Sequence, residues 1–460
     1  MKKRLAIIAL MLTTGVAGFF LYQQPLQAQP LAPAVTEEAV TGPLTISAGE
    51  LLTLDKVVAI TRQNQPSIVA AQGNISASQS RVGQARAPYY PQINGSAVYD
   101  RLSQDSTILG ARGLDGNFDQ LAFRIRGDQL LYDFGKTATR IDIEKTNLEA
   151  ARSNLNTVDD QAVFNAKLAY YNVLKIARDN EVAAETVKQF EEHLQQAQGF
   201  FDAGVKPKYD VTKAEVDLSS AKLVQIQVNN NLRLARVVLN NTMGLPDAPD
   251  YLLANNLTFD RFTLPFEQAL SLALTNRPDL KTLMLRKQAA QQTVALARKG
   301  YTPVLSGNAG ANYSGDTDTL DEGWSVGLAL TVPVFNGHLT RHQIGEARAN
   351  VDIVTADETL LRQNIQKEVQ QNYLILAEAE ERINVAKLTI GQAEENARIA
   401  SGRYSAGVGS PVEVTDADIL LVQAKASHIQ ALYDYRIAQV SIEQAIGVAE
   451  ENDGLPVTTD

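Results

Sequence analysis

Two short stretches of the chain carry residue types that could do chemistry. His338 and His342 stand four residues apart, a spacing at which two imidazoles share one helix face and could bind zinc. No glutamate base lies beside them and no third ligand is evident, so we interpret them as exposed surface histidines. Asp133-Phe134-Gly135 spells a kinase motif, but no glycine-rich loop or catalytic-loop pattern accompanies it. These residues therefore predict no catalytic site, no metal and no cofactor.

Composition excludes further classes of protein. The 460 residues include no cysteine, which excludes a disulfide, a thiolate metal site, a cysteine nucleophile and a lipid-modified N-terminal cysteine. The net charge is −10 and no basic stripe occurs, so nucleic acid is not an expected partner. No phosphate-binding loop, serine elbow or dinucleotide fingerprint occurs. We therefore predict that the protein is not an enzyme.

The N-terminus has the three parts of a secretory signal peptide. Lys2-Lys3-Arg4 is charged, Leu5–Tyr22 is apolar, and Ala28 is a small residue suited to a cleavage site. An uncleaved anchor is the alternative, because such an apolar run nearly spans a bilayer. We predict cleavage and export, with residues 29–50 forming an extended tail. No other apolar run approaches this length, so no transmembrane helix is expected in the mature chain.

Long helical runs dominate the elements around these residues. Lys136–Ala203 has no proline, and its only interior glycine is Gly199. At the usual helical rise this run is roughly 100 Å long. Gly204 and Pro207 then stop it, and a second run, Lys208–Met243, follows. A globular domain cannot bury so long a helix, so we expect a coiled coil, a repeat array or one stave of a larger helical assembly.

The sequence contains an internal duplication. Phe201-Asp202-Ala203-Gly204-Val205 matches Tyr404-Ser405-Ala406-Gly407-Val408, and Asn64-Gln65-Pro66 matches Asn276-Arg277-Pro278. A change of offset between these blocks predicts that the loop near Ser103–Gly116 is longer than its partner in the second half, near Ser314–Glu322. The predicted segments are a signal peptide (1–28), a tail (29–50), a first repeat (51–245), a linker (246–262), a second repeat (263–448) and a C-terminal tail (449–460).

Each half is expected to contain the same elements. A helix begins near Thr53, or near Thr263 in the second half, and a proline at 66 or 278 interrupts it. A strand hairpin, a long helix (Lys136–Ala203, or Leu339–Ala406 in the second half), a tight turn and a return helix follow. From the lengths, we expect two shorter helices to stack end to end beside each long one.

Four stretches alternate apolar and polar residues with aromatics near their ends, as outer-membrane barrel strands do. A half-buried soluble sheet would alternate in the same way. Four strands cannot close a barrel, and open sheet edges cannot lie in lipid, so several copies would have to join. On the polar side, Arg124 and Arg126 are expected to face a water-filled lumen. The predicted strands are Gln92–Arg101, Asp119–Leu131, Val304–Tyr313 and Trp324–Val334.

A set of short stretches occurs in a fixed order along the chain. They are Leu52-Thr53-Leu54-Asp55, Ala85-Arg86-Ala87, Leu131-Tyr132-Asp133-Phe134-Gly135, Pro333-Val334-Phe335-Asn336-Gly337 and the doubled turn. By these stretches, from about Leu52 to Val448, the chain resembles the TolC-like outer membrane efflux family, the outer membrane factors. The resemblance implies an α+β membrane protein with an internal duplication, in which long helices form a periplasmic helical barrel. Four strands per copy would contribute to a shared twelve-stranded barrel in a homotrimer.

The resemblance also implies a function and partners. It implies the outer membrane channel of a tripartite efflux or type I secretion system, passively conducting drugs, small molecules or proteins. The partners would be two further copies, a periplasmic adaptor, an inner-membrane pump or ABC exporter, and outer membrane lipid. The location would be the outer membrane of a Gram-negative-type bacterium. The alternative is a periplasmic helical-hairpin adaptor or scaffold without a pore, which would lack the four strands.

In this family the periplasmic tip of the helical tunnel is the gate. Matching by motif places Asp210, Glu413 and Asp416 at acidic positions of the tip, and Tyr404 at a gating tyrosine. Glu413 and Asp416 also share a helix face, so three copies would form a carboxylate ring that attracts cations. Alternatively, acids in a first helical turn simply favour the helix dipole.

The two turns at the tip are the predicted docking points for the adaptor. They are Ala203-Gly204-Val205 and Ala406-Gly407-Val408. One position departs from the family, because the arginine that ties the closed gate is Gly409 here. Either Arg403 or Lys208 would replace it, or the closed state would be looser.

Overall fold

The computed structural model describes residues 46–102, 118–315 and 320–447. The predicted signal peptide, most of the tail 29–50, the loop Ser103–Gly116 and the C-terminal tail 449–460 lie outside them. The first half contains α2 (Leu54–Asn64), α3 (Pro66–Arg86), η1 (Ala87–Tyr89), β2 (Gln92–Leu102), β3 (Phe118–Tyr132), α4 (Lys136–Asp202) and α5 (Lys208–Thr242). The second half contains α6 (Phe266–Asn276), α7 (Pro278–Arg298), η3 (Lys299–Tyr301), β5 (Val304–Gly315), β6 (Leu320–Thr331), α8 (Leu339–Ser405) and α9 (Pro411–Ala445).

The two halves match helix by helix. Both α2 and α6 have 11 residues, α3 and α7 have 21, α4 and α8 have 67, and α5 and α9 have 35. This confirms the predicted fold class, long helices with a few strands in a duplicated chain. In the described ranges, no helix is both long enough and apolar enough to cross a lipid bilayer.

The helices of the two halves begin differently. Thr53 caps α2 as predicted, because its hydroxyl accepts a hydrogen bond from the backbone N–H of Lys56 at 3.3 Å. The predicted start near Thr263 is wrong, since α6 begins at Phe266 with Pro265 as its N-cap. A proline keeps the residue before it out of the helical conformation, so the helix cannot extend back past Pro265 to Thr263.

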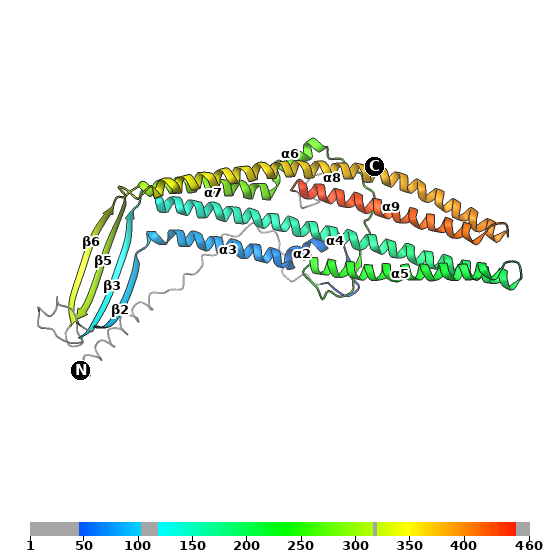
Figure 1. The fold of residues 1–460 in the computed structure, drawn as a ribbon, viewed down its shortest axis with the longest axis horizontal. Helices are drawn as coiled ribbons and strands as arrows, with labels where there is room; N and C mark the ends of the chain where they lie inside the picture. Colours follow the sequence, from blue (N-terminus) through cyan, green and yellow to red (C-terminus); the bar gives the residue numbers. More distant parts are fainter. Residues whose placement is uncertain (1–45, 103–117, 316–319, 448–460) are drawn as a thin grey trace. The chain divides into compact units, whose positions relative to one another are not determined.

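The shorter helices stack end to end beside each long helix, as their lengths predicted (Figure 1). At the first junction, Gln65 donates a hydrogen bond to the carbonyl of Thr242 at 3.1 Å. Gly244, with φ +73°, lies so close to Asn64 that a Cβ atom would stand 2.5 Å from its carbonyl oxygen. Gly447 closes the second junction in the same way with φ +71°. Each junction therefore requires a glycine.

The linker 246–262 and the residues just after it are held by tyrosines of the long helices. Tyr170 of α4 donates to the carbonyl of Ala254 at 2.6 Å, and Tyr373 of α8 donates to that of Leu264 at 2.7 Å. Burial raises the pKa of each of these tyrosines to about 12. Within the linker, Leu252–Leu253 (β4) pairs in parallel with Leu51–Leu52 (β1). Backbone groups of the linker are thereby satisfied by side chains and by a short sheet.

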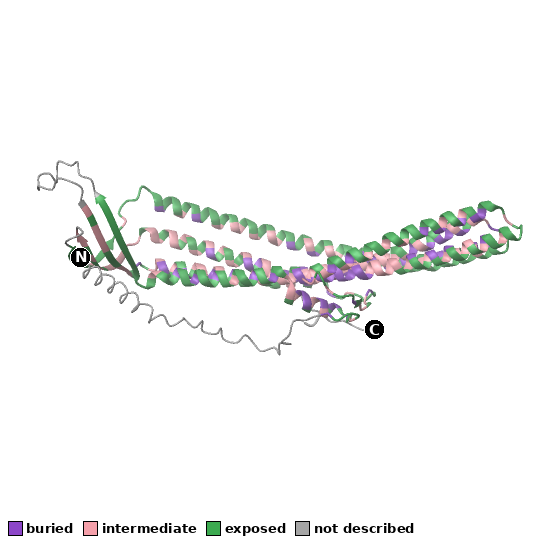
Figure 2. Cartoon of the chain, turned by 90° about the horizontal axis from the view of Figure 1, so that it is seen from below, coloured by how far each residue is buried: buried purple, intermediate pink, exposed green. Residues whose placement is uncertain are grey.

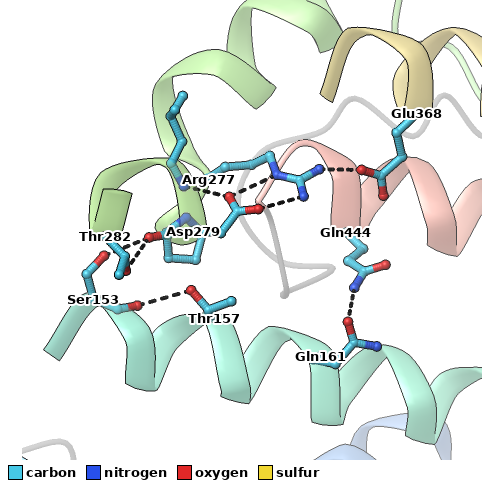
Figure 3. A network of polar contacts seen from close by, with 10 residues as sticks. Ser153, Thr157, Gln161, Arg277, Asp279, Thr282, Glu368 and Gln444 are labelled. Carbon is cyan, nitrogen blue, oxygen red and sulfur yellow. Dashed lines mark hydrogen bonds and ion pairs between the residues drawn. The ribbon is translucent and has the colours of Figure 1, made fainter. Parts of the chain in front are cut away.

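A polar junction joins four helices near the start of α7 (Figure 3). Arg277 forms ion pairs with Asp279 at 2.8 Å and with Glu368 of α8 at 2.7 Å. Ser153 of α4 donates to the carbonyl of Pro278 at 2.8 Å. A proline at the first helical position leaves the break between α6 and α7 short of backbone hydrogen bonds. These side-chain contacts hold the break in place. An amide contact between α4 and α9, Gln161 with Gln444, completes the junction.

The four long strands form one antiparallel sheet in the order β2-β3-β5-β6. Three strands follow the predictions closely, but β6 begins at Leu320 and ends at Thr331 rather than at Val334. Pro333 has no N–H to donate to a ladder, so pairing stops before it. The predicted partner loop, Ser314–Glu322, is correspondingly too long, because both of its ends lie in strands.

Candidate functional site

The two helix turns at the end of the molecule away from the sheet have the same backbone. Gly204 (φ +71°) and Gly407 (φ +80°) take the left-handed conformation that follows each long helix. The next residue, Val205 or Val408, donates its N–H back to the carbonyl five residues earlier, at 2.9 and 3.1 Å. This is the Schellman arrangement, which satisfies the last helical carbonyls. The repeated glycine predicted both turns, and both valines are exposed.

Tyr404 and Asp210 meet in the interior between these turns. The Tyr404 hydroxyl donates to a carboxylate oxygen of Asp210 at 3.4 Å, and both residues are buried. The ring of Phe200 packs edge-on against Tyr404, with centroids 5.7 Å apart. Burial, with a smaller effect of the Asp210 charge and hydrogen bond, raises the pKa of Tyr404 to about 12. The contact joins α5 of the first half to α8 of the second.

Lys206 is the cation that crosses between the two turns. Its ammonium donates to the carbonyl of Gly409 at 3.2 Å and lies 5.5 Å from the ring centroid of Tyr404. A side chain at Gly409 would not fit, since a Cβ atom would lie 2.8 Å from the backbone nitrogen of Tyr404. Arg403 pairs within its own turn and Lys208 is exposed, so neither of the two expected cations makes this contact.

Glu413 and Asp416 lie apart from the buried pair, on the exposed side of the start of α9. The Glu413 carboxylate lies 3.2 Å from the Arg403 guanidinium, and both side chains are about half exposed. The Ser410 hydroxyl accepts the backbone N–H of Glu413 at 3.3 Å and so caps the helix. Of the three predicted acidic residues, the structure therefore brings two to the surface and places Asp210 beneath them.

Several polar contacts near the tip had no clear signal in the sequence. His193 lies 2.9 Å from Asp418, and Thr415 donates to Asp217 at 2.8 Å. Each contact joins α9 to the first half of the chain. Lone polar residues on long helices are usually solvated, and only the packing of one half on the other brings these together. His338 and His342 stay without a third ligand, and no metal-binding group of His, Asp or Glu occurs in the described part of the chain.

The sheet has one polar and one apolar face. Arg124 pairs across the sheet with Ser96 and Asn312, and Arg126 pairs with Asn94. The Arg126 guanidinium also forms an ion pair at 2.9 Å with Asp128, two residues along the same face. Arg124 and Arg126 therefore lie on the polar face.

The opposite face of the sheet is apolar. Figure 2, coloured by burial, shows the strands as exposed or intermediate. Trp324, Val326 and Leu328 of β6 are 81, 74 and 77 % exposed. Ala311 of β5 lies opposite both Ile125 of β3 and Trp324 of β6, so the apolar surface continues across the sheet. Exposure of so large an apolar surface to water is unfavourable. Such a surface indicates a contact with lipid or with another molecule.

Comparison with known proteins identifies the class that this fold and these surfaces define. The chain belongs to the outer membrane efflux protein family, whose model matches residues 57–245 and 269–448. It is 24 % identical to outer membrane protein TolC of Escherichia coli K12, over 92 % of this chain and 87 % of TolC. It is 25 % identical to protein CyaE of Bordetella pertussis, over 97 % and 96 %.

The fold has solved relatives. The outer membrane channel CmeC of Campylobacter jejuni superposes with a TM-score of 0.75 at 17 % identity, over 92 % of this chain and 95 % of that one. The predicted family and fold class are thus confirmed. The chain is an outer membrane efflux protein of the TolC-like class, and CmeC, which shares its fold, is an outer membrane channel.

Proposed function

We propose that this protein is the outer membrane channel of a tripartite efflux or type I secretion system. In this proposal it is a homotrimer that carries drugs, small molecules or proteins passively from the periplasm to the exterior, with no enzymatic step. The observation that carries the proposal is the sheet, which has an exposed apolar face, a polar face and two open edges.

The open edges are the argument for several copies. Within the sheet, β2 and β6 each pair on one side only. A strand edge in hydrocarbon leaves backbone groups without partners, at several kcal/mol each, so a lipid-embedded sheet must close on itself. Four strands are too few, and about eight is the practical minimum. Three copies, the number that the family resemblance implies, give twelve strands with the apolar face outward and Arg124 and Arg126 in the lumen.

The tip is the proposed gate. Around a threefold axis, Glu413 and Asp416 would form a ring of six carboxylates across a narrow opening, which attracts cations and repels anions. Tyr404 and Asp210, held beneath them, would fix the position of the α8–α9 turn against α5. The exposed turns at Ala203-Gly204-Val205 and Ala406-Gly407-Val408 are the proposed contacts for a periplasmic adaptor, which would link the channel to an inner-membrane pump or ABC exporter.

The proposal is tested by the state and activity of the protein in its membrane. The outer membrane fraction should release, in mild detergent, an assembly near three times the 50.0 kDa chain mass, less any cleaved leader. The same material should conduct ions in planar bilayers. A monomer in the periplasmic fraction that does not conduct would favour the alternative, a helical-hairpin adaptor without a pore. The four strands and the family of the chain already weigh against that alternative.

A further inference from the structure

Two helical hairpins, α4 with α5 and α8 with α9, extend from the polar junction to the tip. The contacts between the two hairpins differ in kind from the contacts within each hairpin. Inside the first hairpin, α4 and α5 share an apolar cluster that includes Val187, Phe190 and Leu218. Inside the second, α8 and α9 share one that includes Ala393 and Leu421. Apolar burial of this kind holds each hairpin together as a unit.

Between the hairpins the named side-chain contacts are mostly polar, and we call this contact the hairpin seam. It runs along α4 and α5 on one side and α8 and α9 on the other. Toward the tip its contacts include Glu185–Lys425 at 2.7 Å, His193–Asp418 at 2.9 Å, Gln196–Ser405 at 2.8 Å, Asp217–Thr415 at 2.8 Å and Lys206 with the Gly409 carbonyl at 3.2 Å.

Of the two acid–base contacts in this set, the one between His193 and Asp418 is the more enclosed. The side chain of Asp418 is 7 % exposed and that of His193 is 21 % exposed, whereas Glu185 in the neighbouring ion pair is 61 % exposed. The imidazole also lies against the ring of Phe190, with centroids 6.3 Å apart. A charged hydrogen bond in such surroundings is stronger than at an open surface.

The groups that face this imidazole are mainly acidic. A cavity of about 20 Å³ beside His193 is lined by Asp210 and Asp217 of α5 and by Tyr404 of α8. Lys213 neutralises Asp217 through an ion pair at 2.5 Å. On α4 itself, Glu191 pairs with Lys222 at 3.0 Å and Glu192 is exposed. From α9 comes Asp418, which leaves Asp210 and Asp418 as the enclosed carboxylates that no described lysine or arginine neutralises.

We propose that proton uptake by His193 tightens the hairpin seam, so that the separation of the two hairpins depends on pH. A neutral imidazole gives Asp418 one ordinary hydrogen bond, whereas an imidazolium gives it a charge-assisted one, about twice as strong. Imidazole is the side chain whose charge ordinarily changes between about pH 5 and 8. Mild acid therefore favours the joined hairpins, and mild alkali favours their separation.

The inference concerns a contact inside one chain and can be measured without conduction. The chain has no cysteine, so cysteines at the exposed positions Gln195 and Gln423 give a specific pair of spin labels on α4 and α9. The distance distribution of the full-length, detergent-solubilised protein would be recorded from pH 5.5 to pH 8.5. Two variants in the labelled background, His193→Gln and Asp418→Asn, remove the titrating base and its acidic partner.

In the labelled wild type, the ratio of near to far populations should fall roughly tenfold from pH 5.5 to 8.5, as expected for loss of one charge-assisted hydrogen bond. Both variants should show a ratio that does not change over this range. A wild-type ratio independent of pH, or an unchanged titration in His193→Gln, would overturn the inference. If either variant fails to fold, the wild-type titration and the other variant still test the inference.

A related consequence rests on the proposed function. In a trimeric channel the tighter seam would hold the tip closed, so conductance should fall at low pH in wild type and not in His193→Gln. Loss of conduction at every pH, with the label titration intact, would contradict the channel and leave the seam inference standing.

Discussion

At the scale of single residues, the exposed carboxylates at the start of α9 decide what the tip does to ions. The Glu413→Ala, Asp416→Ala double variant should lose block by multivalent cations in low salt, because it removes every proposed ring carboxylate and frees Arg403. The measurement is single-channel conductance of the trimer with and without a multivalent cation.

A matched control keeps the charge change and moves it away from the tip. The Glu394→Ala, Glu395→Ala variant also removes two exposed carboxylates, about three turns back along α8. It should leave the cation block at the wild-type level. Equal block in the tip variant and in wild type would argue that the acids serve only the start of the helix, where they favour its dipole.

The sequence predicts the residues of the tip better than their partners. Tyr404 and Asp210 follow from the motif, and the structure brings them together. Lys206 could not be chosen over Arg403 or Lys208, because all three stand within a few residues of a turn. Only the packing of one turn against the other decides which ammonium reaches the Gly409 carbonyl. His193 and Asp418 are 225 residues apart, and no local pattern links them.

At the scale of elements, the glycines that follow α4 and α5 separate the cost of backbone conformation from the cost of packing. Gly204 and Gly244 have nearly the same φ, +71° and +73°, but only Gly244 faces a neighbouring backbone. Gly204→Ala should lower the free energy of unfolding by about 1 kcal/mol, which is the cost of placing alanine in the left-handed conformation. Gly244→Ala should cost about 3 kcal/mol or more, because Asn64 must also move.

The measurement for this pair is the midpoint of thermal loss of helical circular dichroism in detergent. Gly204→Ala serves as the control for the conformational term. Similar midpoints for the two variants would mean that the junction between α5 and α3 yields easily, and the end-to-end stacking would then contribute little to stability.

The register of the sheet makes a separate prediction. If the polar face lines the lumen, the Arg124→Glu, Arg126→Glu variant should shift the reversal potential in a salt gradient toward cation selectivity, by exchanging six positive charges for negative ones in a trimer. The control is Arg152→Glu, a reversal on the exposed surface of α4. An unchanged selectivity in the first variant would place the polar face away from the ion path.

The fold was predictable where local chemistry decides it. The bounds of α4 and α8 were predicted to within a residue or two. The prediction used the lack of proline in each long run and the glycine that follows it. Alternation predicted four strands, but not the end of β6, where Pro333 outweighs the apolar pattern that continues through Val332 and Val334. The start of α6 failed for a similar reason, since Pro265 overrides the capping tendency of Thr263.

At the scale of the whole molecule, the meeting point of the two halves carries a pH dependence of stability. Burial, with a smaller contribution from Asp159, raises the pKa of Asp160 to about 6. The folded chain therefore binds a proton at Asp160 before the unfolded chain does, and stability rises as pH falls from about 6 toward about 4. Asp160→Asn should stabilise the protein at pH 7 by about 1 kcal/mol, a value reduced for the partial exposure of the group.

The test compares melting temperatures of wild type and Asp160→Asn at pH 7 and pH 5. The difference between the two proteins should shrink at the lower pH. Asp159→Asn is the control, since it removes the ion pair with Arg62 at 3.0 Å and should lower stability instead. A constant difference between wild type and Asp160→Asn at both pH values would contradict the assignment.

The equal helices of the two halves also limit how this gene can change over time. A single inserted codon within α4 would turn all later side chains by about 100° and displace them by about 1.5 Å relative to α8. Such a frame-preserving insertion would disrupt the contacts that α4 makes with α5, α7 and α9. Unmatched length changes should therefore gather between paired strands and outside the repeats, and here the chain has 15 residues from 103 to 117 against four from 316 to 319.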